Sequence, residues 1–476
     1  MSSTGYKKKL YAYRPDRSPL VLETFRTVKK NRMERADPAT IERGVRQMLA
    51  DKVSGDMLGL WLLIPEHLRL GTWDLLCGWT RQDTVRVEPR LALQLVHEAA
   101  LCVTGIRQRR SLSQKGFELL NGLPFVAGDM AIHDLLNARS VSEAEALQVQ
   151  LGLLRRARGH YQGRLLAIDP HRVPSYSKRM MCRYGSDKGA RPYKIAQTFF
   201  CLDADTKQPV CFTTGSSAIS VSQATPSLLK LTSNILNPVR GEALVLADSE
   251  HYAAEIVDHC KAETPFDLLI PMANTKSLQK RMRALPNDSF IPRWAGFATT
   301  RVPYQMDRAQ TGPHVLFVQR NGERPTDWAF KGFLSTQDRE ELDDLTLNYP
   351  KRWHVEEFFN AHQALGWERA GTRNLNIRYG QMTMALLAQA AIHQFRQRLE
   401  KPYKEWDAKH LAKSVFRGID GDVRVHDDTI LVTLYNAPQA EQMREHYEGL
   451  PDKLNAECVD PRIPWLYGYK LDFRFK

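Results

Sequence analysis

The stretch RLLAID at residues 164–169 opens the part of the chain whose pattern decides the fold, because it is an apolar run that stops on an aspartate. The next stretch, YKIAQTFFCLDADTKQPVCFTT at 193–214, contains two strand patterns around a polar turn and predicts a hairpin. A helix, a strand, a helix and a strand are then predicted at 222–236, 243–250, 252–262 and 266–273. A hairpin that leads into crossover helices predicts an α/β fold with a mixed sheet flanked by helices.

The alternation breaks at residues 276–348, where Pro, Gly and charged residues interrupt short strand patterns such as HVLFVQRN and WAFKGFLST. We interpret this segment as an inserted, β-rich subdomain. Beyond it, the apolar spacing predicts an amphipathic helix at 349–365 and a long apolar helix at 379–399. The tail at 401–476 contains the hairpin pattern DVRVHDDTILVTLY and an aromatic end, so a small docked module is expected there.

Upstream of the sheet, residues 47–159 carry apolar residues at three-to-four spacing without strand alternation, which predicts an all-helical region. Within it, RQRRSLSQKGFELLNGLPFVAGDMAIHDLL at 107–136 predicts a short helix with a serine cap, a Gly-Leu-Pro turn and a second helix. This pattern suits a helix-turn-helix DNA reader beside Arg107, Arg109 and Arg110. An ordinary helical hairpin explains the same pattern equally well.

The charge of the chain favours a polyanionic partner. Lys and Arg number 67 and Asp and Glu number 54, which gives a formal net charge of +13. This charge favours nucleic acid as the partner, and an anionic membrane surface is the second candidate. Residues 1–46 alone carry twelve Lys or Arg against five Asp or Glu. A solvated basic tail and an arm that grips phosphates both fit this composition.

The cysteines and the apolar runs limit the location of the protein. Seven cysteines without any C-x-x-C spacing predict neither a disulfide framework nor a zinc ribbon. No run of eighteen or more apolar residues occurs, and no apolar stretch follows the first lysines. We therefore expect a cytoplasmic protein that is neither exported nor held in a membrane.

Two aspartates stand directly behind apolar strands. Asp169 ends RLLAID, and Asp248 follows ALVLA, so both are expected at the carboxyl ends of buried strands. A buried carboxylate is unfavourable unless it meets a cation. Considered alone, either aspartate would more often be a turn or cap residue.

A third acid changes that interpretation. In YPKRWHVEEFFNAHQALG, Tyr349, Arg352 and Glu356 recur at three and four residues, so they share one face of a helix. A surface pair between Arg352 and Glu356 is the simpler alternative, and Glu357 is a neighbouring decoy. Three converging carboxylates would repel each other, and two Mg²⁺ or Mn²⁺ ions held by oxygen ligands would relieve that repulsion. Two metal ions held in this way support in-line displacement at phosphorus without a protein nucleophile.

At these residues the sequence resembles the DDE transposases of bacterial insertion sequences, in the insertion-sequence-four group, whose signature is Y-x2-R-x3-E-x6-K. Here Tyr349, Arg352 and Glu356 stand at the signature spacing, and Gln363 occupies the position of the lysine. The resemblance implies that Tyr349 and Arg352 take part in catalysis and that position 363 contacts DNA.

The two strand-end motifs, LLAID and LVLADSEHY, resemble the first and second acids of the same family. The resemblance implies a ribonuclease H-like catalytic fold in which Asp169, Asp248 and Glu356 hold the two metal ions. It also implies that the β-rich insertion contains a tryptophan that stacks on a flipped base at the transposon end. Trp328 has a similar position, although a packed core tryptophan is the plain alternative.

Composition and pattern predict four regions: a basic arm, a helical DNA-binding region, a catalytic domain and a carboxyl-terminal module, at 1–46, 47–159, 160–400 and 401–476. The resemblance covers about residues 164–399 of these. It implies metal-dependent DNA cleavage at insertion-sequence ends, followed by strand transfer. The expected partner is double-stranded DNA, at transposon ends and target, bound by a homodimer in the bacterial nucleoid. A metal-dependent nuclease without joining activity and a transposase-derived DNA-binding protein remain as alternatives.

Overall fold

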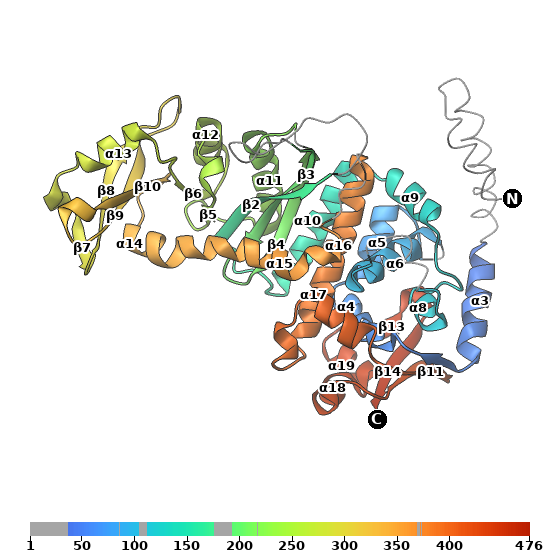
Figure 1. Ribbon diagram of the computed structural model, residues 1–476. Coiled ribbons are helices and arrows are strands. Elements are labelled where there is room, and N and C mark those ends of the chain that lie inside the picture. The colour runs from blue at the N-terminus through green and yellow to red at the C-terminus, as the bar shows by residue number, and fades with distance from the viewer. Residues whose placement is uncertain are drawn as a thin grey trace, which may run out of the picture.

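The structure is a computed structural model that describes residues 37–84, 86–103, 112–175, 193–216, 218–368, 372 and 374–476. These residues build two β-sheets, one of nine strands and one of five, with helices packed against both. Figure 1 shows the large sheet extending to one end of the molecule, while the amino- and carboxyl-terminal regions lie together at the other. The expected mixed α/β fold is confirmed.

The central part of the large sheet follows the predicted order of elements. These are β2 (Leu165–Pro174), β3 (Ile195–Asp203), β4 (Gln208–Ser216), α11 (Val221–Leu236), β5 (Leu244–Leu246), α12 (Ala254–Glu263) and β6 (Asp267–Pro271). The strands lie in the order β4-β3-β2-β5-β6, in which β2, β5 and β6 are parallel and β3 is antiparallel to both its neighbours. All nine residues of β3 are buried, because helices cover both faces of the sheet here.

The register of the three parallel strands fixes where their carboxyl ends lie. Leu246 of β5 is paired with Ala167 of β2 on one side and with Leu269 of β6 on the other. Asp169 and Asp248 each follow this level by two residues. Both aspartates therefore reach the same edge of the sheet, where ligands of open α/β sheets usually bind.

Residues 276–348, where we expect an inserted, β-rich subdomain, form strands that continue the large sheet. Their elements are α13 (Lys276–Arg283), β7 (Ile291–Trp294), β8 (Phe297–Tyr304), β9 (His314–Asn321), β10 (Ala329–Ser335) and α14 (Glu341–Asp343). Strand β10 pairs antiparallel with β6, Phe333 opposite Pro271, and β9, β8 and β7 follow outward. In Figure 1 this extension is drawn in yellow, at the far end from the carboxyl terminus.

The single helix expected at 349–365 is divided into three pieces. Tyr349–Trp353 form a 3-10 helix with Pro350 in its first turn, α15 spans His354–His362, and Gln363–Leu365 form a second 3-10 turn. Proline has no N–H for a preceding helical turn and suits the start of a helix. Pro350 therefore suits the first turn of this segment, whereas the divisions fall after Trp353 and after His362.

Helix α16 (Leu375–Arg396) lies where a long apolar helix is expected at 379–399, and most of its residues are buried. Helices α15 and α16 cover one face of the large sheet and α11 and α12 cover the other, each face with its own hydrophobic core. Consecutive residues of β2 show the division, because Ala167 belongs to the first core and Ile168 to the second. Across the described ranges, no helix has the length and apolar character needed to cross a bilayer.

The amino-terminal region contains α3 (Pro38–Ala50), α4 (Ile64–Arg69), α5 (Thr72–Thr80), α6 (Glu88–Ala100), α8 (Lys115–Leu120), α9 (Asp129–Asn137) and α10 (Val141–Ala157). The all-helical prediction is wrong at one place, because Val53–Gly55 form strand β1. A three-residue strand has no periodicity that a sequence pattern could reveal. The predicted serine cap is also wrong, since Gln114 precedes α8 without a side-chain capping bond.

The carboxyl-terminal module shares a sheet with the amino-terminal region. It contains α17 (Ala408–Leu411), β11 (Gly421–His426), β12 (Thr429–Leu434), α18 (Ala440–Tyr447), α19 (Leu450–Ala456), β13 (Arg462–Ile463) and β14 (Tyr469–Phe475). The sheet order is β1-β11-β12-β14-β13. Close contact holds the two regions together, because a Cβ on Gly59 would lie only 2.0 Å from the carbonyl oxygen of Val415. The hairpin predicted from DVRVHDDTILVTLY is present as β11 and β12.

Candidate active site

Asp169 lies on β2 and faces α15. Strand alternation places it on the same face as Ala167 and opposite Ile168, which belongs to the other core. Its side chain is 16% exposed, and its Oδ1 accepts a 3.3 Å hydrogen bond from Nη1 of Arg352. The buried carboxylate thus meets the cation that its position requires.

Asp248 follows β5 and begins a short 3-10 turn. Its Oδ1 accepts a 3.0 Å hydrogen bond from the backbone N–H of Glu250 and lies 2.8 Å from Nδ1 of His251. The side chain of His251 is buried, so the imidazole has little freedom to turn away. Two local contacts therefore fix the direction of the Asp248 carboxylate.

Arg352 connects the first acid to the third. Its Nη2 donates a 3.0 Å hydrogen bond to Oε1 of Glu356, one helical turn later, while Nη1 bonds to Asp169. Burial lowers the pKa of Arg352, but the neighbouring carboxylates outweigh this effect and the pKa is raised above its ordinary value. One guanidinium group thus holds carboxylates from β2 and α15 together, as its fixed fork of donors allows.

Tyr349 closes the site on the side of β10. Its hydroxyl donates a 3.2 Å hydrogen bond to the carbonyl of Ala247, the residue before Asp248. Its ring packs edge-to-face against Phe333, and burial raises its pKa to about 12. Tyr349 is therefore a neutral hydroxyl at physiological pH, and it joins the helical segment to the end of β5.

The charges of the site act differently on the two aspartates. Burial, followed by the negative charge of Asp248, raises the pKa of Asp169 to about 7, although Arg352 opposes this rise. Burial also acts to raise the pKa of Asp248, but the contacts with His251, Glu250 and Arg352 prevail and lower it. The two strand-end acids lie close enough to repel each other, and Asp248 has the additional hydrogen bonds of its own turn.

Asp169, Asp248 and Glu356 are brought to one region without forming a closed cluster. Among the described residues, no group of three or more His, Cys, Asp or Glu side chains is arranged to hold a metal ion. Arg352 lies between two of the three acids and bonds to both. Movement of this guanidinium would be needed before both oxygens could turn to one cation.

Trp328 lies just before β10, in the insertion, and not beside the three acids. Its ring is half-buried, and the guanidinium of Arg320 lies 3.9 Å from the ring centroid. The edge of the ring also meets Phe330 at 6.4 Å. The ring already has a cation on one face, so a nucleic-acid base would have to use the other face or displace the arginine.

The other residues predicted to contact DNA are Gln363, Arg107, Arg109 and Arg110. Among the described residues, no contact joins any of them to the three acids. Gln363 opens the 3-10 turn after α15, and its carbonyl accepts hydrogen bonds from the N–H groups of the turn that follows. Arg107, Arg109 and Arg110 lie outside the described residues. Their contacts with DNA stay predictions.

Three neighbours of the acids escaped the sequence analysis. His251 contacts Asp248, and the spacing Asp-x-x-His behind a strand was a usable signal. Arg172 pairs with Glu250 beside this turn, a contact between residues 78 positions apart. The Nζ atom of Lys331 lies 5.8 Å from the centroid of the Tyr349 ring, and burial together with Arg352 lowers the pKa of Lys331. The last two contacts join distant strands and turns, so no sequence pattern could reveal them.

Comparison with known proteins gives one family. Residues 160–390 match a family model described as the transposase DDE domain. Among solved structures, the chain is similar to a piggyBac transposase in a synaptic complex with hairpin DNA, with a TM-score of 0.36 and 12% identity. That alignment covers 77% of this chain and 83% of the other. No curated protein matches the chain.

Proposed function

We propose that the chain is a DDE transposase, because residues 160–390 match the family model of the transposase DDE domain, and that Asp169, Asp248 and Glu356 are its three catalytic acids. One observation carries the assignment. Acids from β2, from the end of β5 and from α15 converge on Arg352, which bonds to two of them and lowers the pKa of the third. The reaction class is cleavage and joining of DNA strands.

The three acids fit a pair of divalent cations. All three offer carboxylate oxygens, the donors that Mg²⁺ and Mn²⁺ prefer. The raised pKa of Asp169 comes partly from the charges of Asp248 and Glu356, and a bound cation would remove this unfavourable interaction. When bound, two such ions supply activation of the attacking oxygen and stabilisation of the leaving oxygen.

The remaining side chains position these acids. Arg352 orients Asp169 and Glu356 through one guanidinium, and His251 with the N–H of Glu250 orients Asp248. The bond from Tyr349 to the backbone before Asp248 keeps the helical segment against the strand ends. These contacts orient the acids in the chain alone, and the guanidinium of Arg352 would move aside when cations bind between Asp169 and Glu356.

Finer assignments rest on the signature of the helical segment. We propose membership of the insertion-sequence-four group, a ribonuclease H-like catalytic fold and a homodimer that binds double-stranded DNA at transposon ends and target. Within this group, Trp328 would stack on a base and Gln363 would contact the strand. Arg107, Arg109 and Arg110 would contribute phosphate contacts. Bacterial origin and a nucleoid location belong to the same proposal.

Substitution of the acids tests the catalytic assignment. The Ala variants of Asp169, Asp248 and Glu356 should lose strand cleavage and joining on a duplex that carries the DNA flanking the gene, while DNA binding persists. Glu357→Ala is the matched control for Glu356→Ala, because Glu357 is the next residue on α15 but bonds to Lys207 at the surface. The control should cleave at the wild-type rate. Nicking by Asp248→Ala in Mg²⁺ would remove Asp248 from the mechanism.

A further inference from the structure

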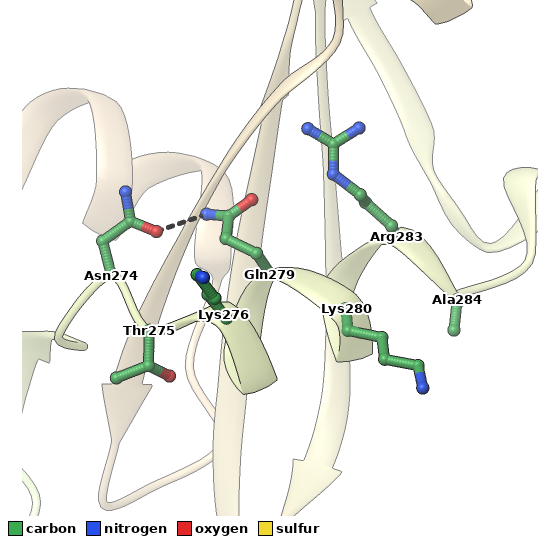
Figure 2. A pocket seen from close by; sticks show the side chains of 7 residues that line it. All are labelled: Asn274, Thr275, Lys276, Gln279, Lys280, Arg283 and Ala284. Carbon is green, nitrogen blue, oxygen red and sulfur yellow. Dashed lines mark hydrogen bonds between the residues drawn. The ribbon is translucent and has the colours of Figure 1, made fainter.

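A cavity of about 510 Å³ lies where the amino-terminal region, the central sheet and the carboxyl-terminal module meet. Its lining comes from α4, the loop after α10, the turn between β3 and β4, and the carboxyl ends of α16 and α19. Figure 2 shows a different hollow, along α13, whose lining residues all belong to one segment at 274–284. Segments that converge from several elements can surround a small molecule, and the volume is typical of small-molecule sites, about 300–1,000 Å³.

The lining of this cavity is polar and positively charged. Three arginines, Arg69, Arg158 and Arg398, stand against one acid, Glu457. Of the ten lining residues, Gly159 alone has no polar side chain. The excess of positive charge favours an anionic occupant, and the polar groups offer it hydrogen bonds.

The three arginines differ in how firmly they are already bonded. Arg69 donates to both carboxylate oxygens of Glu457 and, through Nη1, to Glu66. Arg398 has a longer contact, 3.8 Å from its Nε to Oε1 of Glu66. Arg158 is exposed, and no acid forms an ion pair with it within the described part of the chain. Arg158 and Arg398 therefore keep N–H donors for an anion in the cavity.

A buried arginine lies directly behind the lining. Arg155 donates from Nε to Nδ1 of His160 at 3.1 Å, and its Nη groups donate to oxygens of Gln208 and Pro209. Across the described ranges no carboxylate bonds to this guanidinium, although it is fully buried. Burial and the neighbouring arginines lower the pKa of His160 to about 3, so the ring between Arg155 and the cavity is neutral. An anion in the cavity would supply the missing opposite charge across one ring.

The cavity lies away from the three acids. Thr206, which lines it, belongs to the turn that joins β3 to β4. At the start of this turn, Asp203 pairs with Leu166 of β2, three residues before Asp169. At about 3.3 Å per residue, Asp169 lies about 10 Å farther along the sheet. A phosphate in the cavity is therefore not the phosphate of the bond that the acids cleave.

We propose that this cavity binds a small phosphate-bearing anion of about mononucleotide size, with Arg158 and Arg398 on the phosphate and the Gln397 amide on the remainder. The inference goes beyond the proposed function, because the ligand takes no part in strand cleavage. Since α4, α16 and α19 all contribute to the lining, a bound anion also joins the carboxyl-terminal module to the rest of the chain. Binding should therefore stabilise the folded protein.

Calorimetric titration of the full chain tests the proposal, without divalent cations and at constant ionic strength. Inorganic pyrophosphate, ATP and uncharged adenosine are the probes. Arg158→Gln is compared with Arg474→Gln, an exposed arginine on β14 outside the cavity. We expect pyrophosphate and ATP to bind saturably and adenosine not to bind. Arg158→Gln should weaken binding at least about tenfold, the effect of one charge-assisted hydrogen bond, and Arg474→Gln should bind as the wild type does. Tighter binding of ATP than of pyrophosphate would identify a nucleotide, and equal binding the phosphate group alone.

A second variant adds a negative charge at the rim. Gln397 is exposed, so Gln397→Glu should fold normally and repel the anion, whereas Gln337→Glu, at an exposed position in the insertion, should not. Thermal unfolding provides the independent readout, since pyrophosphate should raise the Tm of wild type and of both controls but not of Arg158→Gln or Gln397→Glu. Absence of saturable binding below about 1 mM, equal binding by Arg158→Gln and Arg474→Gln, or displacement of pyrophosphate by duplex DNA would overturn the proposal. Strand cleavage in Mg²⁺ is scored separately, so the catalytic assignment stands or fails independently.

Discussion

Arg352 joins the two halves of the site, because no other described side chain bonds to both Asp169 and Glu356. Lys at this position keeps the charge but cannot supply two donors in a fixed fork. We expect Arg352→Lys to lower the single-turnover cleavage rate about ten- to a hundredfold, the worth of one charge-assisted hydrogen bond, and Arg352→Ala to lower it further. A surface partner of Glu356 would instead contribute under about 1 kcal/mol of stability and leave turnover unchanged. Wild-type rates in Arg352→Ala would exclude the positioning role.

Asp169 makes stability depend on pH. Burial and the Asp248 charge raise its pKa from 3.8 to about 7, so the folded chain binds this proton more tightly than the unfolded chain does. The contribution of Asp169 to the free energy of unfolding therefore falls as pH rises from about 4 to about 7. We expect Asp169→Asn to be more stable than wild type above about pH 7, by up to about 4 kcal/mol at about 1.36 kcal/mol per pKa unit.

Urea unfolding of both proteins without divalent cations, at several pH values, measures this effect. The advantage of Asp169→Asn should shrink steadily as the pH falls from about 7 to about 4 and vanish below that range, where the wild-type carboxyl is protonated in both states. Other acids titrate in both proteins and cancel in the difference. A stability difference that is independent of pH would contradict the raised pKa.

At the level of single residues, the sequence predicted the candidate site residues whose spacing follows a strand or a helix. Asp169 and Asp248 could be placed at strand ends from the apolar runs before them, and Arg352 with Glu356 from helical periodicity. Lys331 could not be found, because it comes beside Tyr349 only through the pairing of β10 with β6. Long-range pairing of this kind leaves no local pattern.

At the level of elements, the strand and helix order between β2 and β6 could be predicted because each element buries a continuous apolar face. The insertion shows the limit of this approach. Its strand patterns are visible in the sequence. The pairing of β10 with β6 cannot be predicted from them, because β6 becomes an available sheet edge only when the central sheet has formed.

At the scale of the whole molecule, the amino- and carboxyl-terminal regions are pressed together at Gly59, and this contact should be sensitive to a single methyl group. A Cβ there would lie 2.0 Å from the Val415 carbonyl oxygen, a backbone atom that cannot swing aside. We expect Gly59→Ala to lower the free energy of unfolding by at least about 2 kcal/mol through overpacking. Gly78→Ala is the matched control, since Gly78 lies in α5 with no atom near its absent Cβ.

Chemical denaturation of the two alanine variants distinguishes the contact from a general effect of glycine replacement. Gly78→Ala should be neutral or slightly stabilising, by about 0.5–1 kcal/mol, because alanine restricts the unfolded chain in a helical position. Equal stability of the two variants would mean that the regions are not held at Gly59. A large loss confined to Gly59→Ala supports the docking seen here.

The five-stranded sheet has a consequence for protein synthesis. Strand β14 lies between β12 and β13, and β1 pairs with β11 more than three hundred residues later in the chain. A ribosome that has made the catalytic sheet has therefore not yet made the strand that completes the amino-terminal region. Since loops of this length close late, the five-stranded sheet should remain unfinished until β14 leaves the exit tunnel. Translation would thus delay the moment at which a newly made copy can act on DNA.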